Sequence, residues 1–212
     1  QIWQDAINVV QGIQFEMNVD ERQVIVHVPD DFSLGDGSAI PSLFEDILAF
    51  MFTPYGIDQA IFRSDAGIGV ELGPYGLITE MNLVMPVANY KRYEVEAFNQ
   101  TFLIPIPQDE ASLEEALHDL KIRDEAFDVY ETIPEEIEFT VSTTEDQVIV
   151  EFEPFKEPYF EQELMLMIES ILLTAKSYGY ESVSFRQLMV DQIGPYQLTE
   201  PTHVPLAANP IY

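Results

Sequence analysis

The sequence predicts an α+β protein built from two similar two-layer α/β sandwich domains in tandem. Three observations favour this fold class: an internal repeat, alternating apolar residues at the start of each copy, and one amphipathic helix that follows them. The chain has 212 residues, of which 47% are hydrophobic and 12% aromatic, so each copy can bury a core. We expect the first repeat at 1–90, an inter-repeat segment with a short helix at 91–135, and the second repeat at 136–212.

The internal repeat is the most specific feature of the sequence. Residues 12–26 align with residues 136–150 without a gap, and the same offset continues into the helical segment. After a one-residue deletion, Tyr55-Gly56 matches Tyr178-Gly179. About 30% of roughly 75 aligned positions are identical, whereas about 6% is expected by chance for typical residue usage.

Each repeat is expected to begin with a hairpin. Apolar residues alternate in two short runs on either side of a polar turn, as they do in half-buried strands. The runs are Ile13, Phe15 and Met17 with Val24, Val26 and Val28 in the first repeat, and Ile137, Phe139 and Val141 with Val148, Val150 and Phe152 in the second.

A helix with one apolar face follows each hairpin. The apolar residues recur at three- and four-residue spacings from Ile40 to Met51 and from Leu164 to Ala175. Pro41 suits the first turn of the first helix. A Tyr-Gly turn then leads to further short strands, so the strands form one layer and the helix forms the other.

The second helix is also apolar outside this face, at Met165, Leu166 and Leu173. We therefore expect it to be covered on more than one side, most naturally at the interface between the two repeats.

The inter-repeat segment has structure of its own. Phe102 to Pro107 should be extended, because its prolines forbid a helix there. Ser112-Leu-Glu-Glu115 is a capping box that begins a short amphipathic helix. We expect this segment to pack against one or both repeats.

The charge excludes whole classes of partner. The net charge is −29, from 38 Asp and Glu against nine Lys and Arg, so nucleic acid is excluded as a partner and an anionic membrane surface would repel the chain. No apolar run approaches the length of a membrane-spanning helix, and we expect no direct membrane insertion by this segment. The chain begins at Gln1 without a signal sequence, so we expect any anchor to lie upstream.

No pattern of catalytic or metal-ligating residues is present. The absence of cysteine excludes disulfides, thiol nucleophiles and Cys-ligated zinc, and the three histidines do not recur between the repeats. The acidic stretch from Asp30 to Asp36 lacks the ligand spacing of a calcium loop, and Gly67-Ile-Gly69 lacks the third glycine of a phosphate loop. We therefore expect no enzyme, no cofactor and no metal; a hydrolase whose carboxylates meet only in the fold is the remaining catalytic alternative.

One candidate binding loop recurs in both repeats, as an arginine followed by a Gly-Pro-Tyr loop. Its residues are Arg63, Gly73, Pro74 and Tyr75 in the first repeat and Arg186, Gly194, Pro195 and Tyr196 in the second. On one interpretation, each loop binds a partner. On the other, which the residue types favour, glycine and proline shape a turn, tyrosine covers a sheet edge and arginine pairs with local carboxylates.

The order of these motifs resembles the GerMN domain of sporulation and spore-germination proteins. That domain also commonly occurs as a pair in exported proteins of Gram-positive, spore-forming bacteria. The stretch from Ile104 to Pro107, followed by Ser112 to Lys121, is similar to the extracytoplasmic part of the negative regulators of sigma-X activity, which are membrane-anchored anti-sigma factors.

This resemblance implies a non-catalytic sensory or regulatory domain outside the cell, anchored in the cell membrane through a segment upstream of Gln1. A sigma factor would be bound only through a cytoplasmic segment absent from this chain, and the partner of the present segment would be a protein or a component of the cell envelope. The alternative is a structural or binding module of a sporulation or germination protein, associated with the cell envelope or peptidoglycan.

Overall fold

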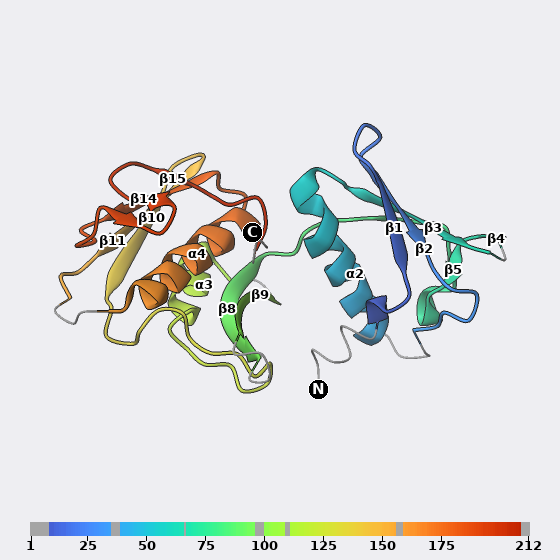
Figure 1. Ribbon diagram of the computed structural model, residues 1–212, viewed down its shortest axis with the longest axis horizontal. Coiled ribbons are helices and arrows are strands. Elements are labelled where there is room, and N and C mark those ends of the chain that lie inside the picture. The colour runs from blue at the N-terminus through green and yellow to red at the C-terminus, as the bar shows by residue number, and fades with distance from the viewer. Residues whose placement is uncertain are drawn as a thin grey trace. The chain divides into compact units, whose positions relative to one another are not determined.

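The computed structural model describes residues 9–34, 39–65, 67–95, 100–108, 111–155 and 159–208, and neither Asp36 nor the side chain of Pro74 belongs to this description. The chain divides into two compact units, Gln1–Pro86 and Val87–Tyr212. Each unit holds a sheet with a helix across it (Figure 1), which confirms the predicted fold class of paired two-layer α/β sandwiches. The three-part division at residues 90 and 135 remains a prediction about where the repeats begin and end.

The first unit contains one five-stranded sheet, a small two-stranded sheet and one long helix among its described residues. The main sheet has the order β1-β2-β3-β4, with β7 also paired to β3. Strands β2 and β3 are parallel and the other pairs are antiparallel. The elements are β1 (Gln14–Asn18), β2 (Gln23–His27), α2 (Ala39–Phe52), the 3-10 helix η1 (Thr53–Tyr55), β3 (Gln59–Ser64), β4 (Gly67–Ile68), β5 (Val70–Glu71), the 3-10 helix η2 (Gly73–Tyr75), β6 (Leu77–Ile78) and β7 (Glu80–Asn82).

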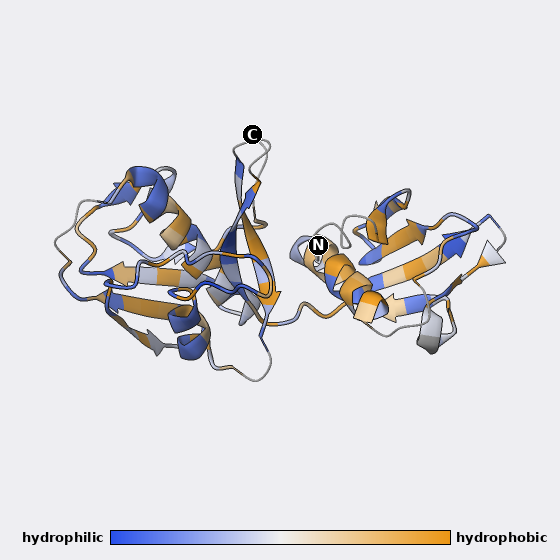
Figure 2. Cartoon of the chain, turned by 90° about the horizontal axis from the view of Figure 1, so that it is seen from below, coloured by the Kyte–Doolittle hydropathy of each residue, from blue (hydrophilic) through white to orange (hydrophobic). Residues whose placement is uncertain are grey.

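The core of the first unit lies between this sheet and α2. Val24 and Val26 alternate along β2 and are fully buried, because side chains two residues apart share one face of a strand. Phe44 and Leu48, four residues apart on α2, meet them, and the ring of Phe44 lies 6.1 Å from that of Phe62 on β3. In Figure 2 the long helix of this unit is largely hydrophobic, and its strands carry both hydrophobic and hydrophilic segments.

The second unit repeats this plan and adds an extra hairpin and a helix. Its main sheet has the order β10-β11-β12-β15, with β11 and β12 parallel. The elements are β8 (Ala88–Val95), β9 (Gln100–Pro107), α3 (Leu113–Asp119), β10 (Phe139–Thr143), β11 (Gln147–Phe152), α4 (Glu161–Ser177), β12 (Ser182–Arg186), β13 (Gln192–Ile193), β14 (Tyr196–Gln197) and β15 (Thr202–His203).

Strand register supports the repeat and reveals one difference. Val26 pairs with Phe62 and Val150 pairs with Phe185, as the one-residue deletion predicted. In the hairpins, however, Phe15 faces Val26, whereas Val141 faces Val150. The first strand of the second repeat is therefore displaced by two residues from the gapless alignment, although four residues separate the last strand pair in both hairpins. A displacement of two keeps every side chain on its original face.

The inter-repeat segment, together with residues 88–90 just before it, forms β8, β9 and α3 and packs on α4. The hydroxyl of Ser177 accepts a hydrogen bond from the amide of Ala88 at 3.0 Å and donates one to its carbonyl at 2.7 Å. The hydroxyl of Thr174 accepts a hydrogen bond from the amide of Tyr90 at 3.1 Å. These contacts, made by residues 88–90 at the start of β8, cover a second side of α4, a source that the apolar pattern of the helix did not identify.

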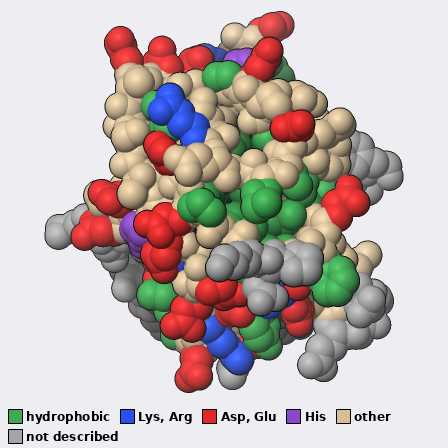
Figure 3. Space-filling model, turned by 90° about the vertical axis from the view of Figure 1, so that its left-hand side faces the viewer, with side chains coloured by type: hydrophobic (Ala, Val, Ile, Leu, Met, Phe, Trp, Pro, Cys, Tyr) green, Lys and Arg blue, Asp and Glu red, His purple; other side chains and the backbone are tan. Residues whose placement is uncertain are grey.

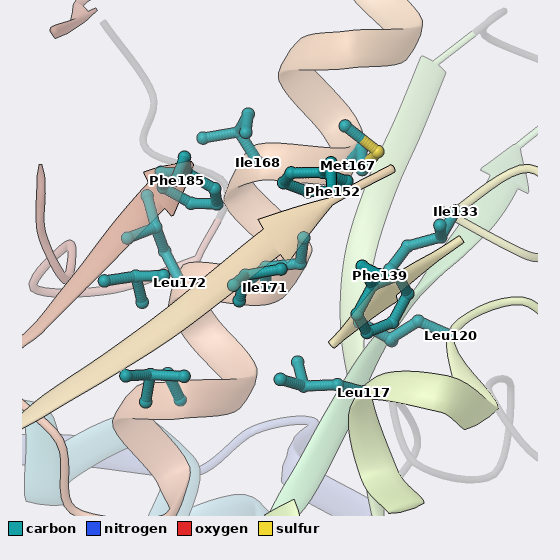
Figure 4. Close-up of a cluster of buried hydrophobic side chains, with 14 of the residues drawn as sticks. Leu117, Leu120, Ile133, Phe139, Phe152, Met167, Ile168, Ile171, Leu172 and Phe185 are labelled. Carbon is teal, nitrogen blue, oxygen red and sulfur yellow. The ribbon is translucent and has the colours of Figure 1, made fainter. Parts of the chain in front are cut away.

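Both local predictions for this segment are confirmed. The proline-containing stretch is strand β9, and Ser112 and Glu115 form a reciprocal capping box at the start of α3. Figure 4 shows the resulting core, in which Leu117 and Leu120 from this segment meet Phe139, with Ile171 of α4 nearby. No helix among the described residues is long and apolar enough to cross a membrane.

Candidate functional site

The two recurring arginines lie at exposed strand positions. Arg63 is in β3, opposite Ile68 of β4, and Arg186 is the last residue of β12, beside Glu151 of β11. Within the described residues neither guanidinium forms an ion pair, although the structural interpretation expected local carboxylate partners. On the face drawn in Figure 3, acidic side chains are dispersed and outnumber the basic ones.

The Gly-Pro-Tyr loop of the second unit is a tight turn packed on α4. Gly194 has a φ of 48°, which glycine adopts readily, and the turn joins β13 to β14. A Cβ at Gly194 would lie 2.9 Å from the sulfur of Met165, so the absence of a side chain lets the turn approach the helix. The hydroxyl of Tyr196 donates a hydrogen bond to Oε1 of Glu169 at 3.0 Å. These contacts agree with a structural role.

The same Gly-Pro-Tyr sequence forms a different loop in the first unit. Gly73, with a φ of 52°, begins the 3-10 helix η2, and the connection between β5 and β6 is longer than the turn in the second unit. Tyr75 is 51% exposed. Leu77 is 67% exposed, whereas Leu198, which follows the matching tyrosine in the second unit, is only 4% exposed. The repeated sequence therefore does not produce a repeated surface.

A groove of about 270 Å³, which we call the first-unit groove, lies beside this loop. Its floor includes Val28 and Val70, and its walls include Ile68 and Leu77. The sequence analysis missed both wall residues. Ile68 lies in Gly67-Ile-Gly69, and the sequence of this stretch does not indicate that its apolar side chain is exposed.

A second cavity, of about 600 Å³, lies in the second unit and is lined by both acidic and basic side chains. Lys121 in its wall is held by Glu138, with 2.9 Å between Nζ and Oε1. The hydroxyl of Tyr159 donates a hydrogen bond of 2.7 Å to Glu136, and this bond is the main reason that the pKa of Glu136 is lowered. A general acid needs the opposite shift. Among the described residues no group of three or more His, Asp and Glu is arranged to hold a metal ion.

The histidines have separate structural surroundings. His27 lies 3.8 Å from Glu16 across the first hairpin, and His118 stacks on the ring of Phe139 with 4.6 Å between centroids. His203 is in the edge strand β15. Within the second unit, His118 and His203 therefore lie at opposite edges of the main sheet.

Comparison with known proteins shows similarity to one family and to proteins of Bacillus subtilis. Residues 3–81 match a family model described as the anti-sigma-X factor RsiX central domain. Anti-sigma-X factor RsiX of Bacillus subtilis (strain 168) is 28% identical to this chain over 194 residues, which cover 90% of this chain and 51% of the relative. The chain thus spans about half the length of this curated relative.

A solved structure is also similar, the tandem GerMN domains of the sporulation protein GerM from Bacillus subtilis. It matches with a TM-score of 0.58 and 14% identity, over 93% of this chain and 79% of that chain. At this identity the likeness shows the fold alone. The resemblance predicted from the sequence is confirmed: the chain has the fold of tandem GerMN domains, and it is similar in sequence to the anti-sigma-X factor RsiX.

Proposed function

We propose that this chain is the extracytoplasmic sensory and regulatory region of a membrane-anchored anti-sigma factor, a negative regulator of an extracytoplasmic-function sigma factor. The observation that carries the proposal is the similarity to anti-sigma-X factor RsiX, which extends over 90% of the chain and therefore through both units. The relative is about twice as long as the matched region, which leaves room for an anchor and a cytoplasmic segment that binds the sigma factor.

Polar groups of the second unit support a non-catalytic role, because they are engaged in structural contacts. Tyr196 bonds to Glu169, Tyr159 bonds to Glu136, and Lys121 bonds to Glu138. The net charge of −29 directs the region towards protein or cell-envelope partners, since it disfavours nucleic acid and an anionic membrane.

Cysteine labelling in intact cells tests the topology. The chain contains no cysteine, so Met189→Cys, at an exposed position of the second unit, introduces a single thiol within it. In the full-length protein, a membrane-impermeant maleimide should label this thiol in intact cells. A control cysteine in the sigma-binding segment should react only after lysis. Reaction of the Met189→Cys thiol only after lysis would place the region inside the cell and overturn the proposal.

A transcriptional reporter tests the regulatory role. The full-length protein should lower expression from a promoter read by its sigma factor, and in-frame removal of the region corresponding to this chain should change how that expression responds to envelope stress. If sigma-dependent expression is the same with and without the protein, and the purified chain sediments with isolated peptidoglycan, the envelope-associated GerMN module replaces the anti-sigma role.

A further inference from the structure

Exposed large hydrophobic side chains are concentrated in the first unit. Among the described residues, eight such side chains belong to the first unit and four to the longer second unit. Single exposed apolar residues are normal on protein surfaces, but a group around a concave surface indicates a binding site. Ile68 and Leu77, which are 70% and 67% exposed, stand on the walls of the first-unit groove.

The second repeat provides an internal comparison. Its Gly-Pro-Tyr loop is closed, because Leu198 is buried and Tyr196 bonds to α4 through Glu169. The first repeat has the same Gly-Pro-Tyr sequence, but its Leu77 is exposed to solvent. In the second repeat the leucine that follows the Gly-Pro-Tyr loop packs into the core of its own unit. In the first repeat the corresponding leucine does not.

The base of the groove is shaped so that Leu77 stands over a glycine. A Cβ at Gly69 would lie 3.0 Å from Cδ1 of Leu77 and 3.1 Å from the carbonyl oxygen of Ile78, so only glycine fits there comfortably. Beneath the walls, Val28 and Val70 are buried and belong to the core of the unit. The groove thus has a firm apolar floor and two apolar walls that are open to solvent.

The charged residues that line the groove are acidic. Asp30 and Glu71 line it, and Asp65 is exposed in the turn between β3 and β4. The first unit carries 13 Asp and Glu against two Arg, and one of these, Arg22, is paired with Asp58 at 2.6 Å. A second copy of the chain or an anionic membrane would bring more negative charge to this surface, whereas a basic partner is attracted to it.

We propose that the first-unit groove binds an extended segment of a partner protein in which an apolar side chain is flanked by Lys or Arg. The apolar side chain enters between Ile68 and Leu77, and the neighbouring cation reaches Asp30 or Glu71. A volume of about 270 Å³ accommodates a side chain and not a whole helix. The inference deepens the proposed function, on which it rests only for the identity of the natural partner.

Peptide binding to the purified 212-residue chain tests the inference. The probe is a peptide of alternating Leu and Lys; one control replaces every Lys with Glu, and another replaces every Leu with Ser. Titration of the ¹⁵N-labelled chain should move the amide signals of Ile68, Gly69 and Leu77 with the Leu/Lys peptide, and the two controls should bind at least about tenfold more weakly. If the Leu-free peptide binds as tightly as the Leu/Lys peptide, binding is due to charge attraction alone and the inference is wrong.

Paired variants locate the site. The double variant Ile68→Ser/Leu77→Ser should weaken Leu/Lys peptide binding by about tenfold or more, because both apolar walls are lost. Met189→Ser removes a similarly exposed apolar side chain from the second unit and should change nothing. Circular dichroism checks that each variant is folded.

Two results would overturn the inference at this stage. One is unchanged affinity in the folded double variant. The other is self-association of the chain that the double variant abolishes, which would make a second copy the occupant of the groove. These measurements use the purified chain alone, so a negative result from cysteine labelling in cells would contradict the proposed function and leave the binding result standing.

Discussion

A buried lysine holds the inter-repeat segment together and leads to a quantitative prediction. Lys91 of β8 is 1% exposed, and its Nζ lies 2.7 Å from Oδ2 of Asp119 at the end of α3. The same ammonium donates a hydrogen bond of 2.8 Å to the carbonyl of Ile122, and the Asn89 amide also bonds to Asp119. The side chain of Asp119 is 36% exposed, so the two partners differ greatly in their access to water.

Because of this difference in exposure, removing one partner of the ion pair should cost more stability than removing the other. Asp119→Ala leaves a buried ammonium with only a carbonyl partner, and we expect a loss of about 3–5 kcal/mol in the free energy of unfolding of the second unit. Lys91→Met replaces the cation by an apolar chain of similar length and leaves a carboxylate that water can reach, so we expect a loss of about 1 kcal/mol or less. The double variant should be more stable than Asp119→Ala alone, because it contains no unpaired buried charge.

Urea unfolding followed by circular dichroism measures these differences. Hydrogen exchange of the amides of Val148 and Val183, on neighbouring central strands, assigns the transition to the second unit. If Asp119→Ala costs no more than Lys91→Met, or if the double variant is the least stable of the three, the argument from buried charge is wrong.

Two further predictions concern local hydrogen bonds. Tyr196→Phe removes the bond to Glu169 and should cost about 0.5–1.5 kcal/mol in urea unfolding, whereas Tyr75→Phe, its counterpart in an exposed loop, should cost less; equal effects would contradict the structural role of the second loop. Ser112→Ala removes the N-cap of α3 and should cost about 1 kcal/mol. Because the hydrogen bonds with Ser112 lower the pKa of Glu115, their stabilising effect is present at neutral pH and is lost as the pH falls through the folded-state pKa; NMR titration of the variant should show that pKa rising.

Local patterns predicted the elements well because their causes are local. The alternation that ends in Phe152 identified a strand, and the Ser112–Glu115 spacing identified a cap whose two hydrogen bonds lie within one turn. The displaced register of the second hairpin could not be found in this way. A period of two is unchanged when one strand moves by two residues, so Phe139 and Val141 fit the pattern equally well opposite Val150.

Long-range contacts escaped prediction for a different reason. Thr174 and Ser177 of α4 are polar and buried, and their hydroxyls accept hydrogen bonds from backbone amides of β8. Their role depends on a hairpin more than eighty residues earlier in the chain, which no local pattern encodes. Leu77 is exposed and Leu198 is buried because the surrounding fold differs, and the leucine that the two repeats share does not indicate this difference in burial.

The second cover of α4 also bears on which unit can respond to a partner. Ten residues of α4 are buried, against five of α2, and β8 covers a second side of α4. A unit whose helix is covered on one side loses less burial when it opens, so local opening is expected to be less costly in the first unit. A partner segment in the first-unit groove would bind only the folded form of that unit and would stabilise it by mass action. We therefore expect occupancy of the first-unit groove to raise the stability of the first unit, while the second unit keeps its stability without a partner.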